Sequence, residues 1–260
     1  GLVTYNNDPK ELEFAMRSVE LSSLPASIAV LHNGKPVVLP NTNLPMQQTA
    51  GKVNLGFGRA HNVLMQEAFK AGNDYYLCMN PDGALTPDCL ASLLTLAVSR
   101  NGLAVVEALQ FPEEHPKDYD AVTLRTDWAS GACLLISRTI FAAIGGFEDQ
   151  FFMYCEDVDL SWRARAMGFE VLTCPWALFL HNVSNRNQKP ETTRQILESC
   201  SQLAEMWGAT DFRAELNRHA EYHGVKLPVA GRMPQEKIRP DEWRSVPCFS
   251  ESTKFARARW

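Results

Sequence analysis

Short apolar runs alternate with amphipathic stretches over the first 110 residues of the chain. The runs that we predict to be strands are residues 1–6, 27–32, 75–80 and 103–110. Between them, apolar side chains recur at helical spacing in residues 9–21, 59–71 and 87–100. Apolar strands that alternate with helices are typical of a mostly parallel sheet with helices on both faces, an α/β fold. Ligands bind such sheets beyond the carboxyl ends of the strands.

The pattern is less regular after residue 110. A polar loop at 112–127 precedes a predicted strand (132–137), a short helix (138–144) and a Gly-Gly-Phe turn. A helix of about ten residues should begin near Asp157 and end at Gly168, before a pair of strands at 169–173 and 177–181. Residues 190–207 and 211–223 are helical in pattern. Beyond Gly224 the chain is rich in proline and charge, which predicts an extended tail, packed on the domain or partly disordered.

The helix predicted at 87–100 has the clearest start signal. We expect Thr86 to cap it, because Pro87 suits the first helical position and Asp88 adds a carboxylate to the first turn.

Composition narrows the classes of protein. With 260 residues, 45% of them hydrophobic, the chain can bury a sizeable core. The net charge of −5 argues against a nucleic-acid binder. Neither a spanning apolar run nor a signal peptide is visible, and the seven cysteines form no CxxC pair. A cytoplasmic location with reduced thiols is therefore expected.

The charge is uneven along the chain. Residues 1–181 hold 12 basic and 20 acidic side chains, whereas residues 182–260 hold 13 and 10. We therefore predict a main domain at 1–182 and a helical and extended appendage at 183–260. The basic end, KFARARW, either contacts an anionic membrane surface peripherally or is a solvated terminus.

Two turns are candidates for substrate binding. LCMNPDG (77–83) ends an apolar strand in Asn80 and Asp82, where a carboxylate could hold Mg²⁺ or Mn²⁺ against phosphates, although these residues also suit an ordinary turn. NLGFGRAHN (54–62) could present backbone N–H groups to a phosphate, or could be a plain helix entry. Neither matches the GxGxxG fingerprint or the GxxxxGK phosphate loop.

FFMYCEDVDLSWRARAMGF (151–169) places Glu156, Asp157 and Asp159 between aromatic residues and two arginines. Acidic residues favour the positive end of the helix dipole, which is a purely structural explanation. A carboxylate at a helix start beside an aromatic wall is also a candidate general base, and both interpretations are open. His181, at the end of the apolar run WALFLH, gains interest as a ligand only if it lies near Asp82.

Taken together, these segments resemble glycosyltransferase family 2, especially its rhamnosyltransferase-like branch. The resemblance covers residues 1–182 and rests on VTYNN, NLGFGRAHN, LCMNPDG, SGACLLISR and the block from GGFEDQFFMYCEDVDLSWRARAMGFEV to PWALFLHN. It implies a GT-A fold, which is an α/β sandwich that binds nucleotide sugars, and an inverting transfer to an acceptor hydroxyl.

The resemblance also implies roles for single residues. Asp157 matches the catalytic base, and Asp82 and His181 match ligands of Mn²⁺ or Mg²⁺. The positions implied to bind the donor are Thr4, Tyr5, Asn6, Asn33, Asn54, Gly56, Arg59, Asn80 and Asp82. Acceptor contacts, each of which could equally be packing, are expected from Glu156, Trp128, Ser130, Gly131 and Trp162. Asp159 is expected to be structural and to pair with Arg163.

The chain departs from the family pattern in three places. The turn LHNGK has His32 and Asn33 where the family often has an aspartate, which leaves the nucleoside contacts open. Asn80 begins the DxD-type motif and leaves it one carboxylate. Glu148 replaces a usual aspartate in the Gly-Gly-Phe loop.

The leading functional hypothesis is a metal-dependent, inverting hexosyltransferase. It would move a sugar from dTDP-rhamnose or a UDP-sugar to a glycan or lipid-linked acceptor in bacterial surface polysaccharide synthesis. A sugar nucleotidyltransferase would share the sheet and the metal site, but it should have a basic glycine-rich loop where this chain has VTYNNDP. A binding module without catalysis is the third hypothesis, and the presence of Asp82, Asp157 and His181 argues against it.

Overall fold

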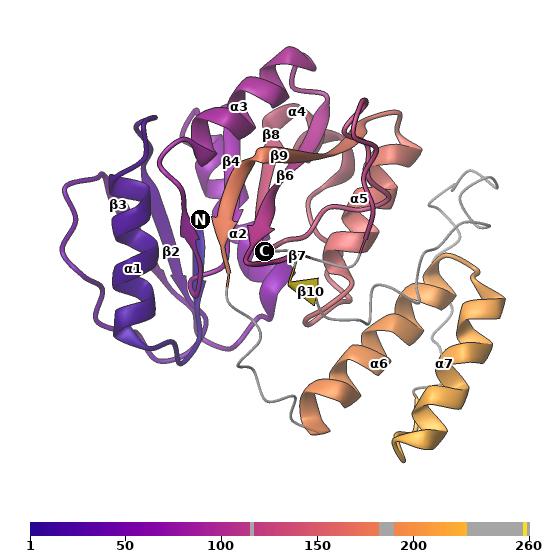
Figure 1. Ribbon diagram of the computed structural model, residues 1–260. Helices are drawn as coiled ribbons and strands as arrows, with labels where there is room; N and C mark the ends of the chain where they lie inside the picture. Colours follow the sequence, from indigo (N-terminus) through magenta and orange to yellow (C-terminus); the bar gives the residue numbers. More distant parts are fainter. Residues whose placement is uncertain (115–116, 182–189, 228–256, 259–260) are drawn as a thin grey trace.

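The structure is a computed structural model and describes residues 1–114, 117–181, 190–227 and 257–258 (Figure 1). The strands are β1 (Leu2–Thr4), β2 (Ile28–His32), β3 (Met46–Ala50), β4 (Tyr75–Met79), β5 (Ala84–Leu85), β6 (Ala104–Phe111), β7 (Glu113–Glu114), β8 (Cys133–Ser137), β9 (Glu170–Leu180) and β10 (Arg257–Ala258). The helices are α1 (Pro9–Glu20), α2 (Phe57–Lys70), α3 (Cys89–Ser99), α4 (Arg138–Ile144), α5 (Glu156–Ala166), α6 (Pro190–Met206) and α7 (Thr210–Tyr222).

Eight of the strands form one sheet in the order β3-β2-β1-β4-β8-β6-β9-β5. Strand β1 is parallel to β2 and β4, β2 is parallel to β3, and β6 is parallel to β9. Strand β8 is antiparallel to both β4 and β6, so its first residue, Cys133, lies opposite Met79 at the end of β4. The loop that enters β8 therefore reaches the edge where the parallel strands end.

Helices cover both faces of the sheet, as the alternating pattern predicted. One apolar cluster joins the sheet to α1 and α3, through buried residues such as Met16 and Leu93. A second cluster joins the other face to α2, α4 and α5, through residues such as Leu64, Ile140 and Leu160. The predicted α/β sandwich with a mostly parallel sheet is confirmed.

Helices α6 and α7 lie side by side on the outside of α5 (Figure 1). They share a third apolar cluster with α5, which includes Trp162 of α5, Leu203 of α6 and Phe212 of α7. The rings of Trp162 and Trp207 meet edge to face, with centroids 5.2 Å apart. The boundary predicted after residue 182 falls among residues 182–189, outside the described residues, and remains a prediction.

Local sequence explains the ends of several helices. The side chain of Asp8 accepts a hydrogen bond from the Lys10 N–H at the start of α1 (2.9 Å), and Ser137 accepts one from Ile140 at the start of α4 (3.2 Å). Gly168, with φ +84°, follows α5 as predicted.

Two predicted details are wrong, and one strand was missed. Thr86 does not cap α3: its hydroxyl donates to the Leu178 carbonyl (3.1 Å), and the helix begins at Cys89. The two strands expected at 169–173 and 177–181 are the single strand β9, whose register against β6 shifts after Cys174, where Pro175 interrupts the ladder. Strand β3 was not predicted, because its sequence, MQQTA, is polar and largely exposed at the sheet edge.

Most of the predicted extended tail lies outside the described residues. Within it, β10 pairs antiparallel with β7. Among the described residues, no helix has both the length and the apolar character needed to cross a bilayer.

Candidate active site

The carboxyl ends of β1, β2, β4, β6 and β9 meet at one edge of the sheet, and the predicted site residues are grouped there. Asn80 and Asp82 follow β4, and His181 follows β9. The loop before β8 adds Ser130 and Gly131, and the start of α5 adds Glu156 and Asp157.

Asp82 and His181 lie next to each other although 98 residues separate them in the sequence. Asp82 Oδ1 is 3.4 Å from His181 Nε2, and Asn80 Nδ2 is 3.5 Å from the same nitrogen. His181 Nδ1 is 2.8 Å from Oε1 of Gln110, the last residue but one of β6. Burial lowers the pKa of His181 to about 4, so its imidazole is neutral at pH 7.

These residues fit a divalent cation that is shared with a substrate. Two ligand atoms bound to one ion at about 2.0–2.2 Å lie roughly 3 Å apart, close to the 3.4 Å between Asp82 Oδ1 and His181 Nε2. The described residues contain no group of three His, Cys, Asp or Glu side chains arranged to hold a metal. Asp82 and His181 alone would leave positions for phosphate oxygens and water, which is how Mg²⁺ is commonly held.

The Asn-Pro-Asp-Gly turn is shaped by its surroundings. The Asn80 N–H donates to the Ala132 carbonyl (2.8 Å), which ties the turn to the loop before β8. A Cβ atom on Gly83 would lie 2.0 Å from the ring of Phe179. The glycine therefore allows the ring to pack against this turn.

Asp157 is half-buried at the first turn of α5. Its Oδ2 accepts a hydrogen bond from the Gly131 N–H and its Oδ1 accepts one from the Val158 N–H, both 2.9 Å long. Burial raises the pKa of Asp157, and these two hydrogen bonds act in the opposite direction. The backbone thus orients the carboxylate, and its raised pKa makes it a stronger base than an exposed aspartate.

Glu156 has different surroundings from its neighbour. It is 5% exposed, and its Oε2 has no hydrogen-bond partner in the described part of the chain. Burial, followed by the negative charge of Asp157, raises the pKa of Glu156 well above its usual range. Glu156 therefore holds its proton to a higher pH than an exposed glutamate does, whereas Asp157 keeps the hydrogen bonds that suit a carboxylate.

The backbone before α5 is unusual. Tyr154 and Cys155 both have left-handed conformations, with φ of +71° and +66°. Such residues cost of order 1–3 kcal/mol each and are found where the surrounding structure enforces them. Here the chain turns sharply between the aromatic residues at 151–154 and Glu156, the first residue of α5.

The aromatic turn contacts the glycine loop before α2. The Phe57 N–H donates to the Phe152 carbonyl (2.9 Å). Gly56 has φ +80°, and a Cβ there would lie 2.0 Å from that same carbonyl oxygen. The glycine is therefore required for the close approach of the two loops.

The residues predicted to bind the donor lie at the ends of β1 and β2 and before α2. Tyr5, Asn6 and Arg59 are exposed. Thr4 is buried, and its hydroxyl lies 3.0 Å from His32 Nδ1. Their roles remain predictions.

Asn33 is 2% exposed and organises the glycine loop. Its Nδ2 donates to Asn54 Oδ1 (2.7 Å) and to the Gly56 carbonyl (2.8 Å), and its Oδ1 accepts from the Leu55 N–H (2.7 Å). The Asn33 side chain thus holds the glycine loop in place, a role that the sequence did not predict.

The residues predicted to contact the acceptor are mostly covered. Trp128 and Trp162 are each 4% exposed and belong to the cluster under α6. Ser130 donates its N–H to Glu107 Oε2 (2.6 Å), and Gly131 holds Asp157. Contact of these residues, and of Glu156, with an acceptor remains a prediction.

Two further residues were missed from the sequence. Glu107 is buried within β6, where it accepts hydrogen bonds from Ser130, from the Thr173 hydroxyl (2.6 Å) and from Lys117. Gln110 supports His181 from the same strand. The available signal was the two polar residues within an otherwise apolar strand, AVVEALQF, but their partners depend on the register between β6 and β9.

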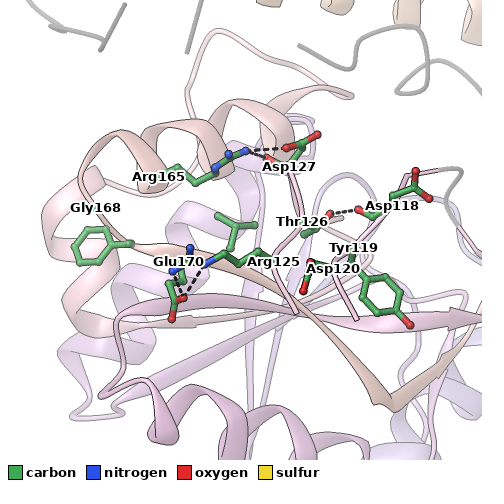
Figure 2. A pocket seen from close by; sticks show the side chains of 11 residues that line it. Asp118, Tyr119, Asp120, Arg125, Thr126, Asp127, Arg165, Gly168 and Glu170 are labelled. Atoms are coloured by element: carbon green, nitrogen blue, oxygen red, sulfur yellow. Dashed lines mark hydrogen bonds and ion pairs between the residues drawn. The ribbon is translucent and has the colours of Figure 1, made fainter. Parts of the chain in front are cut away.

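A separate hollow of about 560 Å³ lies at the other end of β9 (Figure 2). Two ion pairs lie in this hollow: Arg125 donates to Glu170 (2.8 Å) and Arg165 to Asp127 (3.2 Å). Glu170 is the first residue of β9 and His181 follows its last, so the length of this strand separates the hollow from the candidate site.

Several known proteins similar to this chain are glycosyltransferases, although no family model matches it. The chain is 29% identical over 231 residues to N-acetylglucosaminyl-diphospho-decaprenol L-rhamnosyltransferase of Mycobacterium tuberculosis, which covers 69% of this chain and 74% of that protein. It is 25% identical over 166 residues to the rhamnosyltransferase WbbL of Escherichia coli, covering 51% and 63% of the two chains. The predicted resemblance to rhamnosyltransferases is confirmed.

Solved structures confirm the GT-A fold. GalNAc-T7, crystallised with UDP, GalNAc and Mn²⁺, superposes with a TM-score of 0.61 at 13% identity, over 87% of this chain and 54% of that one. The mannosyltransferase PcManGT of Pyrobaculum calidifontis, in complex with GDP-Man and Mn²⁺, gives the same TM-score and identity over 86% and 75%. At this identity the superpositions are informative about the fold alone.

Proposed function

We propose a specific reaction for this chain, which is a glycosyltransferase with the GT-A fold and is similar to rhamnosyltransferases. It transfers a sugar, with inversion, from a nucleoside-diphosphate donor to a hydroxyl of a glycan or lipid-linked acceptor in bacterial surface polysaccharide synthesis. The proposed donor is dTDP-rhamnose or a UDP-sugar, and the names of two relatives, both rhamnosyltransferases, favour rhamnose as the sugar. The observation that supports the proposal best is the grouping of Asp157 with Asp82 and His181 at one edge of the sheet.

In this reaction Asp157 is the general base. The acceptor oxygen attacks the anomeric carbon, the bond from that carbon to the diphosphate breaks, and the acceptor proton passes to the Asp157 carboxylate. The Gly131 and Val158 N–H groups hold the carboxylate in one orientation throughout. A carboxylate whose pKa is raised by burial is a better base than an exposed aspartate.

The leaving group is a nucleoside diphosphate, and Asp82 and His181 would hold Mn²⁺ or Mg²⁺ beside it. A bound divalent cation supplies positive charge that stabilises the diphosphate as it departs. The glycine loop at 54–58 is held by Asn33, and the N–H groups of its residues 55–57 are bonded within the protein, so the first turn of α2 beyond Phe57 would face the donor phosphates.

Replacing Asp157 with Asn tests the base. Asn keeps the shape of the side chain but accepts no proton, so we expect kcat to fall by about 10² to 10⁴-fold. Donor affinity, measured by calorimetry with a nucleoside diphosphate and MnCl₂, should stay unchanged. An equal loss of binding and turnover would assign Asp157 a structural role instead.

Replacing Asp82 with Ala tests the metal ligand. We expect Mn²⁺-dependent binding of the nucleoside diphosphate to weaken, while binding in EDTA stays as in the unmodified protein. Unchanged Mn²⁺-dependent binding in this variant would refute the metal assignment.

The products distinguish the competing functions. Transfer of a sugar releases a nucleoside diphosphate, whereas a sugar nucleotidyltransferase run in the synthetic direction releases pyrophosphate. A non-catalytic module would bind a nucleotide sugar and release neither. Two incubations with MnCl₂ separate the three outcomes: one with a panel of nucleotide sugars, assayed for nucleoside diphosphate, and one with nucleoside triphosphates and sugar 1-phosphates, assayed for pyrophosphate.

A further inference from the structure

His181 is held between two strands by contacts on both ring nitrogens. On one side, Nδ1 lies 2.8 Å from Gln110 Oε1. On the other side, Nε2 lies 3.4 Å from Asp82 Oδ1. His181 and Gln110 are 4% and 5% exposed, so water is largely excluded from the contact between them.

Gln110 is fixed by the sheet rather than by a loop. It lies within β6 and pairs with Phe179 of β9, two residues before the histidine. The His181 N–H donates to the carbonyl of Phe111, the neighbour of Gln110 (2.8 Å). The backbone of β6 thus holds the histidine main chain, while a side chain of the same strand holds its ring.

A neutral imidazole carries a single proton, and its position decides whether Nε2 can bind a cation. With the proton on Nε2, the ring would donate to Asp82, and both atoms would be unavailable to an ion. With the proton on Nδ1, the ring donates to Gln110, and the Nε2 lone pair faces Asp82.

We propose that Gln110 is the positioning residue of the metal site: its amide oxygen accepts the Nδ1 proton of His181 and thereby leaves Nε2 unprotonated beside Asp82. The inference rests on the proposed function, since it assumes that Asp82 and His181 hold a divalent cation. Outer partners of metal-binding histidines have this effect in general, and their loss typically costs 10- to 100-fold in metal affinity.

The choice of an amide is consistent with its neighbours. Gln110 lines a small hollow together with Glu107, Glu114 and Lys117, and Glu114 is 5% exposed. A glutamine accepts the histidine proton without adding another negative charge to this buried, acidic region.

The first experiment measures Mn²⁺ affinity from the electron paramagnetic resonance signal of free Mn²⁺, with and without UDP. Gln110→Leu removes the acceptor and should weaken Mn²⁺ binding by about 10- to 100-fold. Gln110→Glu keeps an acceptor oxygen at this position and should bind Mn²⁺ about as tightly as the unmodified protein does. Binding of UDP in EDTA should be the same in all three proteins.

Ser137→Ala is a control for general destabilisation. It removes the cap of α4 at the opposite edge of the sheet, where Ser137 pairs with Tyr75. This variant should melt at a lower temperature and bind Mn²⁺ as the unmodified protein does. If it lost Mn²⁺ affinity as much as Gln110→Leu, the effect at Gln110 would be one of stability and the proposal would fail.

The second experiment identifies the proton directly. Long-range ¹H–¹⁵N correlation of the His181 ring should show a protonated Nδ1 in the unmodified protein and in Gln110→Glu, and a loss of this preference in Gln110→Leu. Protonation of Nε2 in the unmodified protein would overturn the proposal.

His181→Ala distinguishes a failure of the positioning role of Gln110 from a failure of the metal site. If His181→Ala loses Mn²⁺ affinity and Gln110→Leu keeps it, the metal site stands and the positioning role is refuted. If both variants bind Mn²⁺ normally, the metal site of the proposed function is itself wrong, and the positioning role with it.

Discussion

Glu156 and Asp157 are adjacent in the sequence, but the structure gives them opposite surroundings. Two backbone N–H groups stabilise the charge of Asp157, whereas Glu156 Oε2 is buried without a partner among the described residues. The family resemblance assigned the base to Asp157 and an acceptor contact to Glu156, but the sequence did not predict their different surroundings. That difference depends on the loop before β8, which approaches α5 only in the folded chain.

Glu156 should make stability depend on pH. Its pKa in the folded protein is raised well above the usual 4.5, so the folded state holds the proton more tightly than the unfolded state. The free energy of unfolding should therefore decrease as pH rises from about 4.5 toward the raised pKa. Glu156→Gln, which resembles the neutral acid, should remove this decrease and become more stable than the unmodified protein as pH rises.

Urea unfolding between pH 5 and pH 8 measures the effect. The difference in free energy of unfolding between Glu156→Gln and the unmodified protein should grow in favour of the variant with increasing pH. A constant difference across this range would show that Glu156 ionises as an exposed glutamate does.

At the scale of elements, α5 is the helix on which the site depends. Asp159 pairs with Arg163 one turn further on (2.7 Å), as the sequence predicted, and Arg163 also donates to the carbonyls of Ile144 and Gly146. Asp159 further accepts a hydrogen bond from Trp207 Nε1 (3.0 Å). One buried ion pair thus links α5 to α4 and to the end of α6.

Replacing Asp159 with Ala should be severe. It leaves the Arg163 charge buried at 7% exposure without its carboxylate, which typically costs 3–5 kcal/mol. Glu198→Ala, which breaks the exposed pair of Arg194 and Glu198 on α6, should cost about 0.5 kcal/mol or less. Chemical denaturation compares the two variants, and a similar small cost for both would contradict the structural role of Asp159.

The sequence predicted the elements that have strong local signals better than the strands whose bounds depend on pairing with a neighbouring strand. Helix α5 was located by its apolar spacing and by Gly168, both of which are local. Strand β3 was missed because it is a polar edge strand, held by its hydrogen bonds to β2. The gap predicted between the strands at 169–173 and 177–181 lies inside β9, because β6 continues to pair with β9 beyond the register shift.

At the scale of the whole molecule, α6 and α7, which were predicted as an appendage, share a core with residues 1–181. Phe151, Val158 and Trp162 pack in the same cluster as Leu203 and Trp207. The sequence suggested a boundary from a change in charge, but the apolar residues of α6 are inward facing and need a partner surface. Only the structure identifies α5 as that surface.

Truncation after residue 181 tests this dependence. Without α6 and α7, the outer face of α5 would expose the aromatic residues of the third cluster, so we expect a lower melting temperature and binding of a hydrophobic dye. Melting curves and dye fluorescence of the truncated and full chains provide the comparison. A truncated chain that melts like the full chain would show that residues 1–181 form an independent domain.

The hydrogen bond from Phe57 to Phe152 has a kinetic consequence. It joins the loop proposed to meet the donor to the turn that precedes the proposed base, at a point where Gly56 leaves no room for a side chain. A shift of either segment must displace the other. We therefore expect the two substrates to be coupled, so that the Michaelis constant for one varies with occupancy by the other.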